Sequence, residues 1–182
     1  MKKKLSAILC CLFFCLCSCS DSAVPSQPEN TERGQEFMPL TEIQEGRKNI
    51  YIIVKSLDNS YWDVVINGAK TAGEDFNCNV YYAGTYSETD WEYQSNLLDD
   101  CIQNDADAIL LAPDDSVMLA PKITEVYGTG IPVILIDTIA NTENYDLCYM
   151  TDNLIAGRNA AKEMISLLEK RGFSEDDTVN IG

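Results

Sequence analysis

The chain has 182 residues, of which 13 are Lys or Arg, 29 are Asp or Glu and none is His, and its formal net charge is −16. Without an imidazole the chain cannot build a Ser-His-Asp triad, a Cys-His pair or a His-containing metal site. The acidic balance also disfavours binding to nucleic acid and to anionic lipid surfaces, because both are polyanions.

The first segment, residues 1–19, has the organisation of a secretion signal. Three lysines follow Met1, and an apolar run extends over residues 5–16. This run is shorter than the roughly 20 residues that span a bilayer, so it is typical of a cleaved signal. The stretch Leu16-Cys17-Ser18-Cys19 resembles a bacterial lipobox, which implies a lipid on Cys19 that anchors an extracytoplasmic protein to the cell membrane.

Residues 20–48 are predicted to form a flexible tether, because Ser, Pro, Glu, Gln and Thr replace most large apolar side chains there. Three cysteines, Cys78, Cys101 and Cys148, remain beyond the signal and the tether. An odd number without a spaced framework argues against a disulfide scaffold, and we expect small buried apolar side chains instead.

From residue 49 onward, short apolar runs alternate with segments of helical periodicity. The predicted strands cover 50–54, 79–83, 108–112, 132–136, 147–150 and 178–181, and the predicted helices cover 61–76, 88–103, 116–127 and 153–171. This alternation predicts an α/β fold, a doubly wound parallel sheet with helices on both faces. Such sheets bind ligands at the carboxyl ends of their strands, beside the switch in strand order.

The loop after the first predicted strand carries two short polar side chains, Asp58 and Asn59, and two aromatic rings, Tyr61 and Trp62. It has no glycine before Gly68, so a dinucleotide or phosphate site is disfavoured. One interpretation makes Asn59 or Ser60 the helix cap and both rings part of the core, and Trp62 suits it better than Tyr61 because Trp62 shares the apolar stripe of the helix. The other interpretation places these side chains on a ligand.

The ends of the later strands are also polar. Asp114 follows the third strand, Asp137 and Thr138 follow the fourth, and Asp152 follows the fifth. Some of these residues suit caps and turns, but Asp137 directly follows an apolar run, where a carboxylate is costly unless it is paired or faces a cleft. Aromatic faces beside carboxylates suit a sugar, although an acidic cleft could equally hold a cation.

These residues resemble, in order and spacing, the type I periplasmic binding proteins, specifically the ribose- and galactose-type solute-binding components of ABC importers. The matching stretches are Asp58-Asn59-Ser60-Tyr61-Trp62, Ala108-Ile109-Leu110-Leu111-Ala112-Pro113, Gly130-Ile131-Pro132-Val133-Ile134-Leu135-Ile136-Asp137, and Thr151-Asp152-Asn153 followed by Gly157. The resemblance implies two lobes that close on a ligand. Residues 49–151 would form the N-terminal lobe, and residues 152–182 the crossover and the start of a truncated C-terminal lobe.

In this family the first loop supplies an Asn and an aromatic pair to the sugar, which carries over to Asn59, Tyr61 and Trp62. The acid after the fourth strand, here Asp137, binds sugar hydroxyls. Many sugar binders have an Arg directly after that acid, whereas this chain has Thr138. Ribose specificity is therefore not supported by the resemblance.

The sequence thus predicts a lipid-anchored solute-binding protein without cofactor, metal or catalysis, which captures a small polar ligand, in our interpretation a carbohydrate, for an ABC permease. The expected ligand contacts are Asp58, Asn59, Tyr61, Trp62, Asp114, Asp137, Thr138 and Asp152. Three alternatives stay open: a sensory module for a signalling receptor, a binder of cationic or nucleoside ligands, and a glycoside hydrolase built on Asp58, Asp114 and Asp137.

Overall fold

A computed structural model describes residues 34–180. The predicted signal, the lipidation site Cys19 and residues 20–33 of the predicted tether lie outside the described residues. The elements, in chain order, are β1 (Gly34–Pro39), β2 (Asn49–Val54), α1 (Ser60–Asp75), β3 (Asn79–Thr85), α2 (Trp91–Gln103), β4 (Ala108–Leu111), α3 (Ala120–Gly128), β5 (Val133–Ile136), β6 (Leu147–Tyr149) and α4 (Asn153–Lys170).

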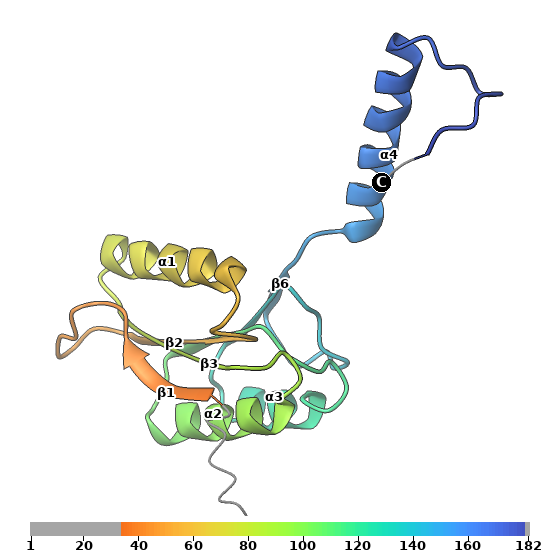
Figure 1. Cartoon of the computed structure of the whole chain (residues 1–182). Coiled ribbons are helices and arrows are strands. Elements are labelled where there is room, and N and C mark those ends of the chain that lie inside the picture. The colour runs from red at the N-terminus through yellow and green to blue at the C-terminus, as the bar shows by residue number, and fades with distance from the viewer. Residues whose placement is uncertain (1–33, 181–182) are drawn as a thin grey trace, which may run out of the picture. The chain divides into compact units, whose positions relative to one another are not determined.

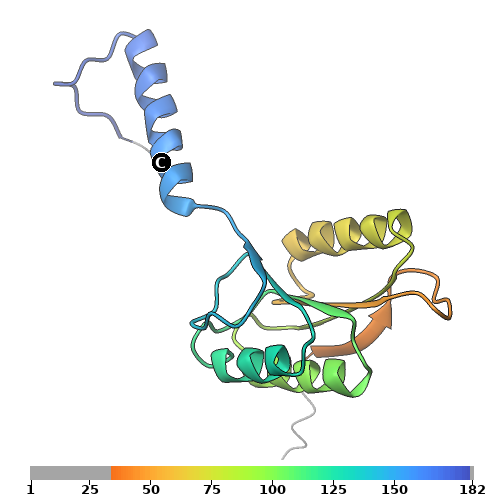
Figure 2. The same cartoon turned by 180° about the vertical axis from the view of Figure 1, so that it is seen from behind.

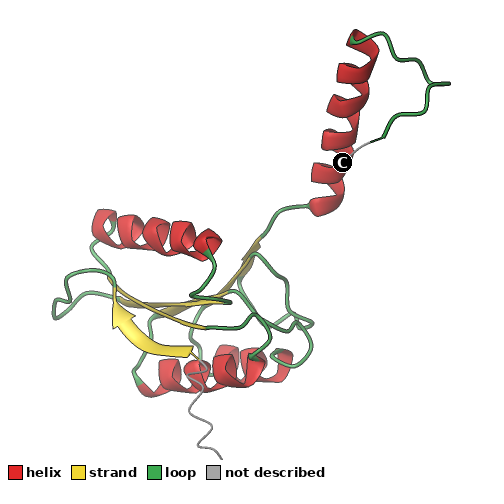
Figure 3. Ribbon diagram, in the orientation of Figure 1, coloured by secondary structure: helices red, strands yellow, loops and turns green. Residues whose placement is uncertain are grey.

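The strands form one six-stranded sheet in the order β1-β3-β2-β4-β5-β6 (Figures 1 and 3). The ladders from β3 to β6 are parallel, and only β1 pairs antiparallel, at the edge of β3. From β2 the chain passes first to β3 on one side and then to β4 on the other. The doubly wound α/β fold is therefore confirmed, and its switch in strand order lies beside β2.

The helices cover the two faces of the sheet, α1 on one face and α2 with α3 on the other (Figures 1 and 2). Successive residues of β2 divide between the two cores, as the period of two in a strand requires. Ile53 belongs to the larger cluster, with Leu98 of α2 and Ile123 of α3. Ile52 belongs to the smaller cluster, with Trp62 of α1.

The structure differs from the sequence prediction at both ends of the folded part. Strand β1 lies within the predicted tether, because its backbone pairs with β3 from Gly34 to Pro39. The predicted strand over 178–181 is wrong for residues 178–180, which have no strand pairing, and residue 181 is not described. Helix α4 has no buried residue. None of the helices in residues 34–180 combines the length and apolar composition that crossing a bilayer requires.

Two helices begin later than the apolar periodicity predicts, because polar side chains bond the preceding backbone. Asp90 is the N-cap of α2 and accepts from the backbone N–H of Tyr93. Asp115 accepts from the N–H groups of Val117 and Met118, which closes a turn ahead of α3. Side-chain oxygens that bond nearby N–H groups in this way favour caps and turns over helix interiors.

The cysteines Cys78, Cys101 and Cys148 are free.

Gln94 of α2 connects the ends of two central strands. Its side chain is fully buried. The amide nitrogen donates to the carbonyl oxygens of Val54, at 3.3 Å, and Ala112, at 2.9 Å, and the amide oxygen accepts from the N–H of Asp114 at 2.8 Å. The last peptide groups of β2 and β4 therefore have partners in the core even though their strands end there.

We expect Gln94→Leu to lower the free energy of unfolding by about 3 kcal/mol or more, because two buried backbone carbonyl groups and one partly buried N–H group lose the Gln94 amide as a partner. Gln103→Leu, on the exposed face of the same helix, serves as the control and should change stability by less than about 0.5 kcal/mol. Denaturant unfolding measures both variants. A similar small loss in both would show that the Gln94 amide is not needed to hold the strand ends.

Candidate ligand-binding site

Asp137 directly follows β5 and has a backbone φ of 64°, in the left-handed region that Asp tolerates better than most residues. Its N–H donates to the carbonyl oxygen of Tyr149, after which the chain leaves the sheet. This turn places the carboxylate at the carboxyl edge of the sheet, where the sequence predicted it. Strained backbone of this kind is often found at functional sites.

The Asp137 carboxylate lies in a cluster of three donors. Its Oδ2 accepts from Lys55 Nζ at 2.8 Å and from Thr138 Oγ1 at 2.9 Å. Burial by itself would raise the pKa of Asp137, but the hydrogen bonds from Lys55 and Thr138, the charge of Lys55 and a hydrogen bond from Tyr61 outweigh it and lower that pKa. Asp137 is therefore an ionised acceptor at neutral pH.

The two adjacent aromatic residues have different environments. Tyr61 is 53% exposed, whereas Trp62 is only 2% exposed and packs in the smaller core. Their rings meet edge to face, with centroids 4.9 Å apart. Tyr61 thus offers an aromatic face beside Asp137. Trp62 contacts the Tyr61 ring and lies in the smaller core. Its position on the apolar stripe of the helix had indicated this core position as one of the two interpretations.

Asn59 caps α1, and Glu88 organises the loop around it. The Asn59 side-chain oxygen accepts from the N–H of Tyr61 at 3.0 Å, and its Nδ2 donates to Glu88 Oε1 at 3.2 Å. The indole N–H of Trp62 donates to the same Glu88 oxygen at 3.2 Å. Glu88 was not predicted as a site residue, because the periodicity placed it in a helix that in fact begins at Trp91.

Asp114, after β4, is a buried carboxyl group with an incomplete set of partners. Within residues 34–180 its Oδ1 is buried and has no hydrogen-bond partner, and its Oδ2 is 3.5 Å from Thr85 Oγ1. Burial raises the pKa of Asp114 to about 7, and the nearby charges of Glu88 and Asp90 add to this shift while that of Lys55 opposes it. Asp114 therefore titrates near neutral pH, within reach of the Lys55 charge.

The remaining predicted contacts, Asp58 and Asp152, are exposed. The backbone N–H of Asp58 donates to Ser56 Oγ at 3.2 Å. Asp152 is the N-cap of α4 and accepts from the N–H of Ile155 at 2.9 Å. The structure thus brings Tyr61, Asp137 and Thr138 together, and in the described part of the chain no hydrogen bond or ion pair joins Asp58 or Asp152 to that cluster.

Lys55, which was not among the predicted ligand contacts, completes the cluster. Its side chain is 16% exposed, and besides Asp137 it donates to Thr138 Oγ1 at 2.5 Å. One signal could have found it: Lys55 directly follows an apolar strand at the same sheet edge as Asp137. A partly buried charge at such a place requires a partner, and the partner is 82 residues away in the sequence.

An open cleft of about 530 Å³ adjoins the cluster on the α1 side of the sheet. Its polar and aromatic lining comes from Tyr61, Trp62, Asp137, Tyr149 and Thr151, and the rest is apolar. The size and mixed lining suit a small ligand with polar and apolar faces. One end of the cleft lies at the carboxyl ends of β5 and β6, the sheet edge where doubly wound sheets bind their ligands, and the rest extends along α1 over Ile52 and Leu110.

A doubly wound sheet with a ligand cleft at its carboxyl edge is found in several classes of protein, and the periplasmic binding proteins are one of them. The chain belongs to that family, because the family model of the periplasmic binding protein domain matches residues 50–179. The ribose import binding protein RbsB of Bacillus subtilis (strain 168) is 26% identical over 171 residues, which cover 93% of this chain and 52% of that relative. The chain therefore spans about half the length of this curated relative.

Two solved structures show the same similarity. A carbohydrate transporter solute-binding protein from Agrobacterium radiobacter, in complex with D-arabinose, is 29% identical with a TM-score of 0.63, covering 70% of this chain and 43% of that one. An ABC transporter solute-binding protein from Agrobacterium vitis, with bound D-fucose, is 31% identical with a TM-score of 0.59, covering 66% of this chain and 43% of that one.

Replacing Asp114 and replacing its neighbour Asp115 by Asn are predicted to change the stability of the fold in opposite directions. Folding raises the pKa of Asp114 from 3.8 to about 7, so ionising this buried carboxyl destabilises the fold increasingly between pH 4 and 7. Asp114→Asn should therefore gain stability relative to the parent as pH rises through this window. Thermal unfolding at pH 4, 5.5, 7 and 8 measures the difference.

Asp115→Asn is the matched control. Hydrogen bonds from the backbone N–H groups of Met118 and Val117 lower the pKa of Asp115. Its stabilising contribution is therefore present above pH 4 and disappears as pH falls through the lowered pKa. Asp115→Asn should lose stability relative to the parent above pH 4. Parallel pH profiles for the two variants would contradict the assigned environments.

Proposed function

We propose that this protein is an extracytoplasmic solute-binding protein that captures a small carbohydrate and delivers it to an ABC permease in the membrane. The observation that carries this proposal is the exposed Tyr61 ring beside the ionised Asp137 carboxylate, at the edge of the cleft. An aromatic face stacks on the C–H surface of a sugar ring, and a carboxylate accepts from adjacent hydroxyls. The D-arabinose and D-fucose in the two solved relatives support a sugar as the ligand class.

The lipid anchor at Cys19 and the permease partner are parts of the same proposal. A lipid on Cys19 would keep the binding lobe near the membrane surface without a membrane-spanning helix. The extracytoplasmic location is supported by membership of the periplasmic binding protein family. The role as a sensory module for a signalling receptor stays an alternative, which a sugar response in a receptor assay would favour.

Catalysis on the same carboxylates has less support. A glycosidase needs two carboxyl groups that face the scissile bond, one protonated and one ionised. Asp114 has a raised pKa, but its Oδ1 is buried and its Oδ2 is directed at Thr85. We therefore assign Asp114 to the support of the strand ends, and we propose that the ligand leaves the site unchanged.

The proposal predicts that the chain binds at least one of D-ribose, D-allose, D-arabinose and D-fucose, with amide shifts at Tyr61, Asp137 and Thr138 in an NMR titration. Asp137→Asn should weaken that binding roughly 10-fold to 100-fold, because a hydrogen bond to a charged acceptor is worth about 1.5–3 kcal/mol. Dissociation constants from the titration measure the effect.

Asp107→Asn is the matched control, since Asp107 pairs with Lys48 at the opposite edge of the sheet, 2.5 Å apart. This variant should bind the sugar like the parent. Shifts with nucleosides or amines but with none of the four sugars would refute the carbohydrate class. Equal affinities of Asp137→Asn and the parent would remove Asp137 from the site.

A further inference from the structure

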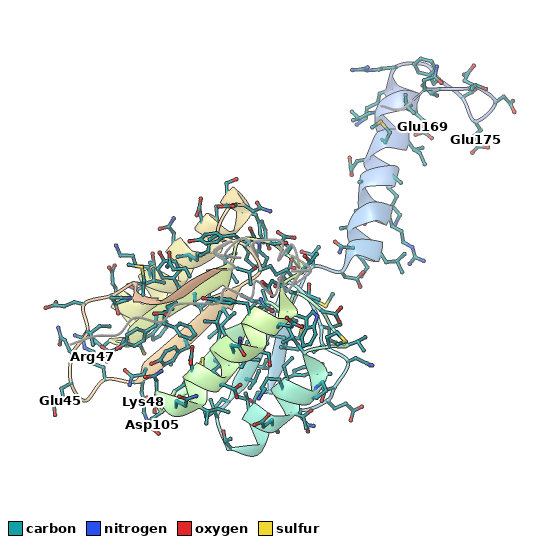
Figure 4. The ribbon with its side chains drawn as sticks, turned by 60° about the horizontal axis from the view of Figure 1, so that its bottom comes forward. Glu45, Arg47, Lys48, Asp105, Glu169 and Glu175 are labelled. Carbon is teal, nitrogen blue, oxygen red and sulfur yellow. The ribbon has the colours of Figure 1, made fainter. Side chains whose placement is uncertain are left out.

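A second pocket, of about 270 Å³, lies on the other face of the sheet, beside α2. Figure 4 looks onto this face, with α2 and α3 in front. The pocket shares no lining residue with the cleft beside Tyr61. Three aromatic residues, two carboxylates and one amide line it: Glu36, Phe37, Tyr51, Tyr81, Asp100 and Asn104. It therefore combines an aromatic wall with negative charge.

A β-bulge in β1 turns two neighbouring side chains toward this pocket. The register of β1 against β3 shifts between Gln35 and Met38, so that Glu36 and Phe37 both oppose Ala83. In a regular strand, neighbouring side chains point to opposite faces, and a bulge re-aims one of them. Glu36 and Phe37 consequently line the same pocket.

The aromatic rings form a corner around Tyr51. Phe37 meets Tyr51 edge to face, with ring centroids 4.7 Å apart at 86°, and Tyr81 stacks on Tyr51 at 4.9 Å and 15°. Tyr51 is only 5% exposed, and it lines the pocket. Within residues 34–180 its hydroxyl makes no hydrogen bond, although a buried Tyr hydroxyl usually has a partner. The Tyr51 hydroxyl is therefore a polar group that a ligand in the pocket could bond.

The two carboxylates at the pocket are not neutralised. In the described part of the chain neither Glu36 nor Asp100 forms an ion pair, whereas Asp99 pairs with Lys122 at 2.8 Å. Burial raises the pKa of Asp100, and the charges of Glu36 and Asp99 add to this shift. Asp100 also lies in the last turn of α2, where the helix dipole disfavours an acid and no basic residue compensates it. Local arrangements that cost stability in this way are expected at functional sites.

The basic residues at the amino edge of the sheet leave this negative charge in place. Figure 4 shows Arg47 and Lys48 in the loop before β2 and Asp105 in the loop after α2. Lys48 Nζ pairs with Asp107 at 2.5 Å, and neither basic residue lines the pocket. The carboxyl-terminal end of α2, with its cap at Asn104, adds partial negative charge. The electrostatics of the pocket therefore favour a cation.

We propose that this pocket is a second ligand site, which binds a small alkylammonium ion. The ammonium N–H groups donate to the carboxylates of Glu36 and Asp100 and to the Tyr51 hydroxyl. The positive charge and the C–H groups beside it lie against the rings of Phe37 and Tyr81. A neutral alcohol of the same shape lacks the charge, and an inorganic cation lacks the apolar part. The site goes beyond the proposed sugar binding and is separate from it.

An NMR titration of the isotope-labelled full chain, at pH 7 and constant ionic strength, tests the site with n-butylammonium chloride, n-butanol and potassium chloride. We expect n-butylammonium to cause saturable amide shifts at Phe37, Tyr81 and Asp100. It should bind at least about tenfold more tightly than n-butanol, because the alcohol cannot form charge-assisted hydrogen bonds. Potassium chloride should cause no saturable shifts at these amides.

Three variants test the groups that are assigned to the ligand. Asp100→Asn should weaken n-butylammonium binding roughly 10-fold, and Tyr51→Phe, which keeps the ring, about threefold. Phe37→Leu keeps an apolar side chain without the aromatic face and should weaken binding about twofold to fivefold. Asp75→Asn is the matched control, because Asp75 is an exposed acid of α1, on the opposite face of the sheet. It should leave the affinity unchanged.

Loss of binding is separated from damage to the fold by thermal unfolding. Asp100→Asn should not lower the melting temperature, because folding raises the pKa of Asp100 and its ionised form therefore destabilises the fold. A weaker affinity in this variant thus reports on the pocket, even if Tyr51→Phe is less stable. Equal binding of n-butanol and n-butylammonium, or the same shifts with potassium, would refute an ammonium site. Unchanged affinity in Asp100→Asn would also overturn the proposal, and sugar binding in the cleft stands or fails independently.

Discussion

The buried amide of Gln94 is the interaction on which the site depends. Parallel strands end together at one edge of the sheet, and there their last peptide groups lose the ladder that satisfied them. Gln94 supplies those partners from α2, for Val54 and Ala112 through its amide nitrogen and for Asp114 through its oxygen. The ends of β2 and β4 can therefore stop in a dry environment and still present side chains to the cleft.

The positions of these strand ends determine how charges are arranged in the site. Lys55 continues β2 and Asp137 continues β5, so the topology brings a cation and a carboxylate together across the end of β4. Asp114, between them in strand order, lies deeper and titrates near neutral pH. The cluster thus contains one ionised acceptor, one cation and one carboxyl group whose charge depends on pH. Such an arrangement binds a polar ligand by matched donors and acceptors.

Much of this was predictable from the sequence, because the apolar strands and periodic helices dictate an α/β sheet and its ligand-binding edge. Asp137 was predictable, since an acid after five apolar residues requires a special environment. Lys55 carries the same signal, since it also directly follows an apolar strand, but its pairing with Asp137 was not predictable because 82 residues separate the two in the sequence. Strand β1 was missed for a related reason: its polar sequence pairs at an edge, where the backbone of β3 supplies the bonding. The late start of α2 depends on the cap Asp90, and that of α3 on the turn that Asp115 closes ahead of it.

The central claim is that a sugar lies on the Tyr61 ring with its hydroxyls toward Asp137. Intermolecular NOEs between the sugar and the isotope-labelled chain test it most directly. The account predicts NOEs from the C–H protons of the bound sugar to the Tyr61 ring protons, which disappear in Tyr61→Ala while the fold is retained. NOEs to side chains away from the carboxyl edge, with none to Tyr61, would contradict the account.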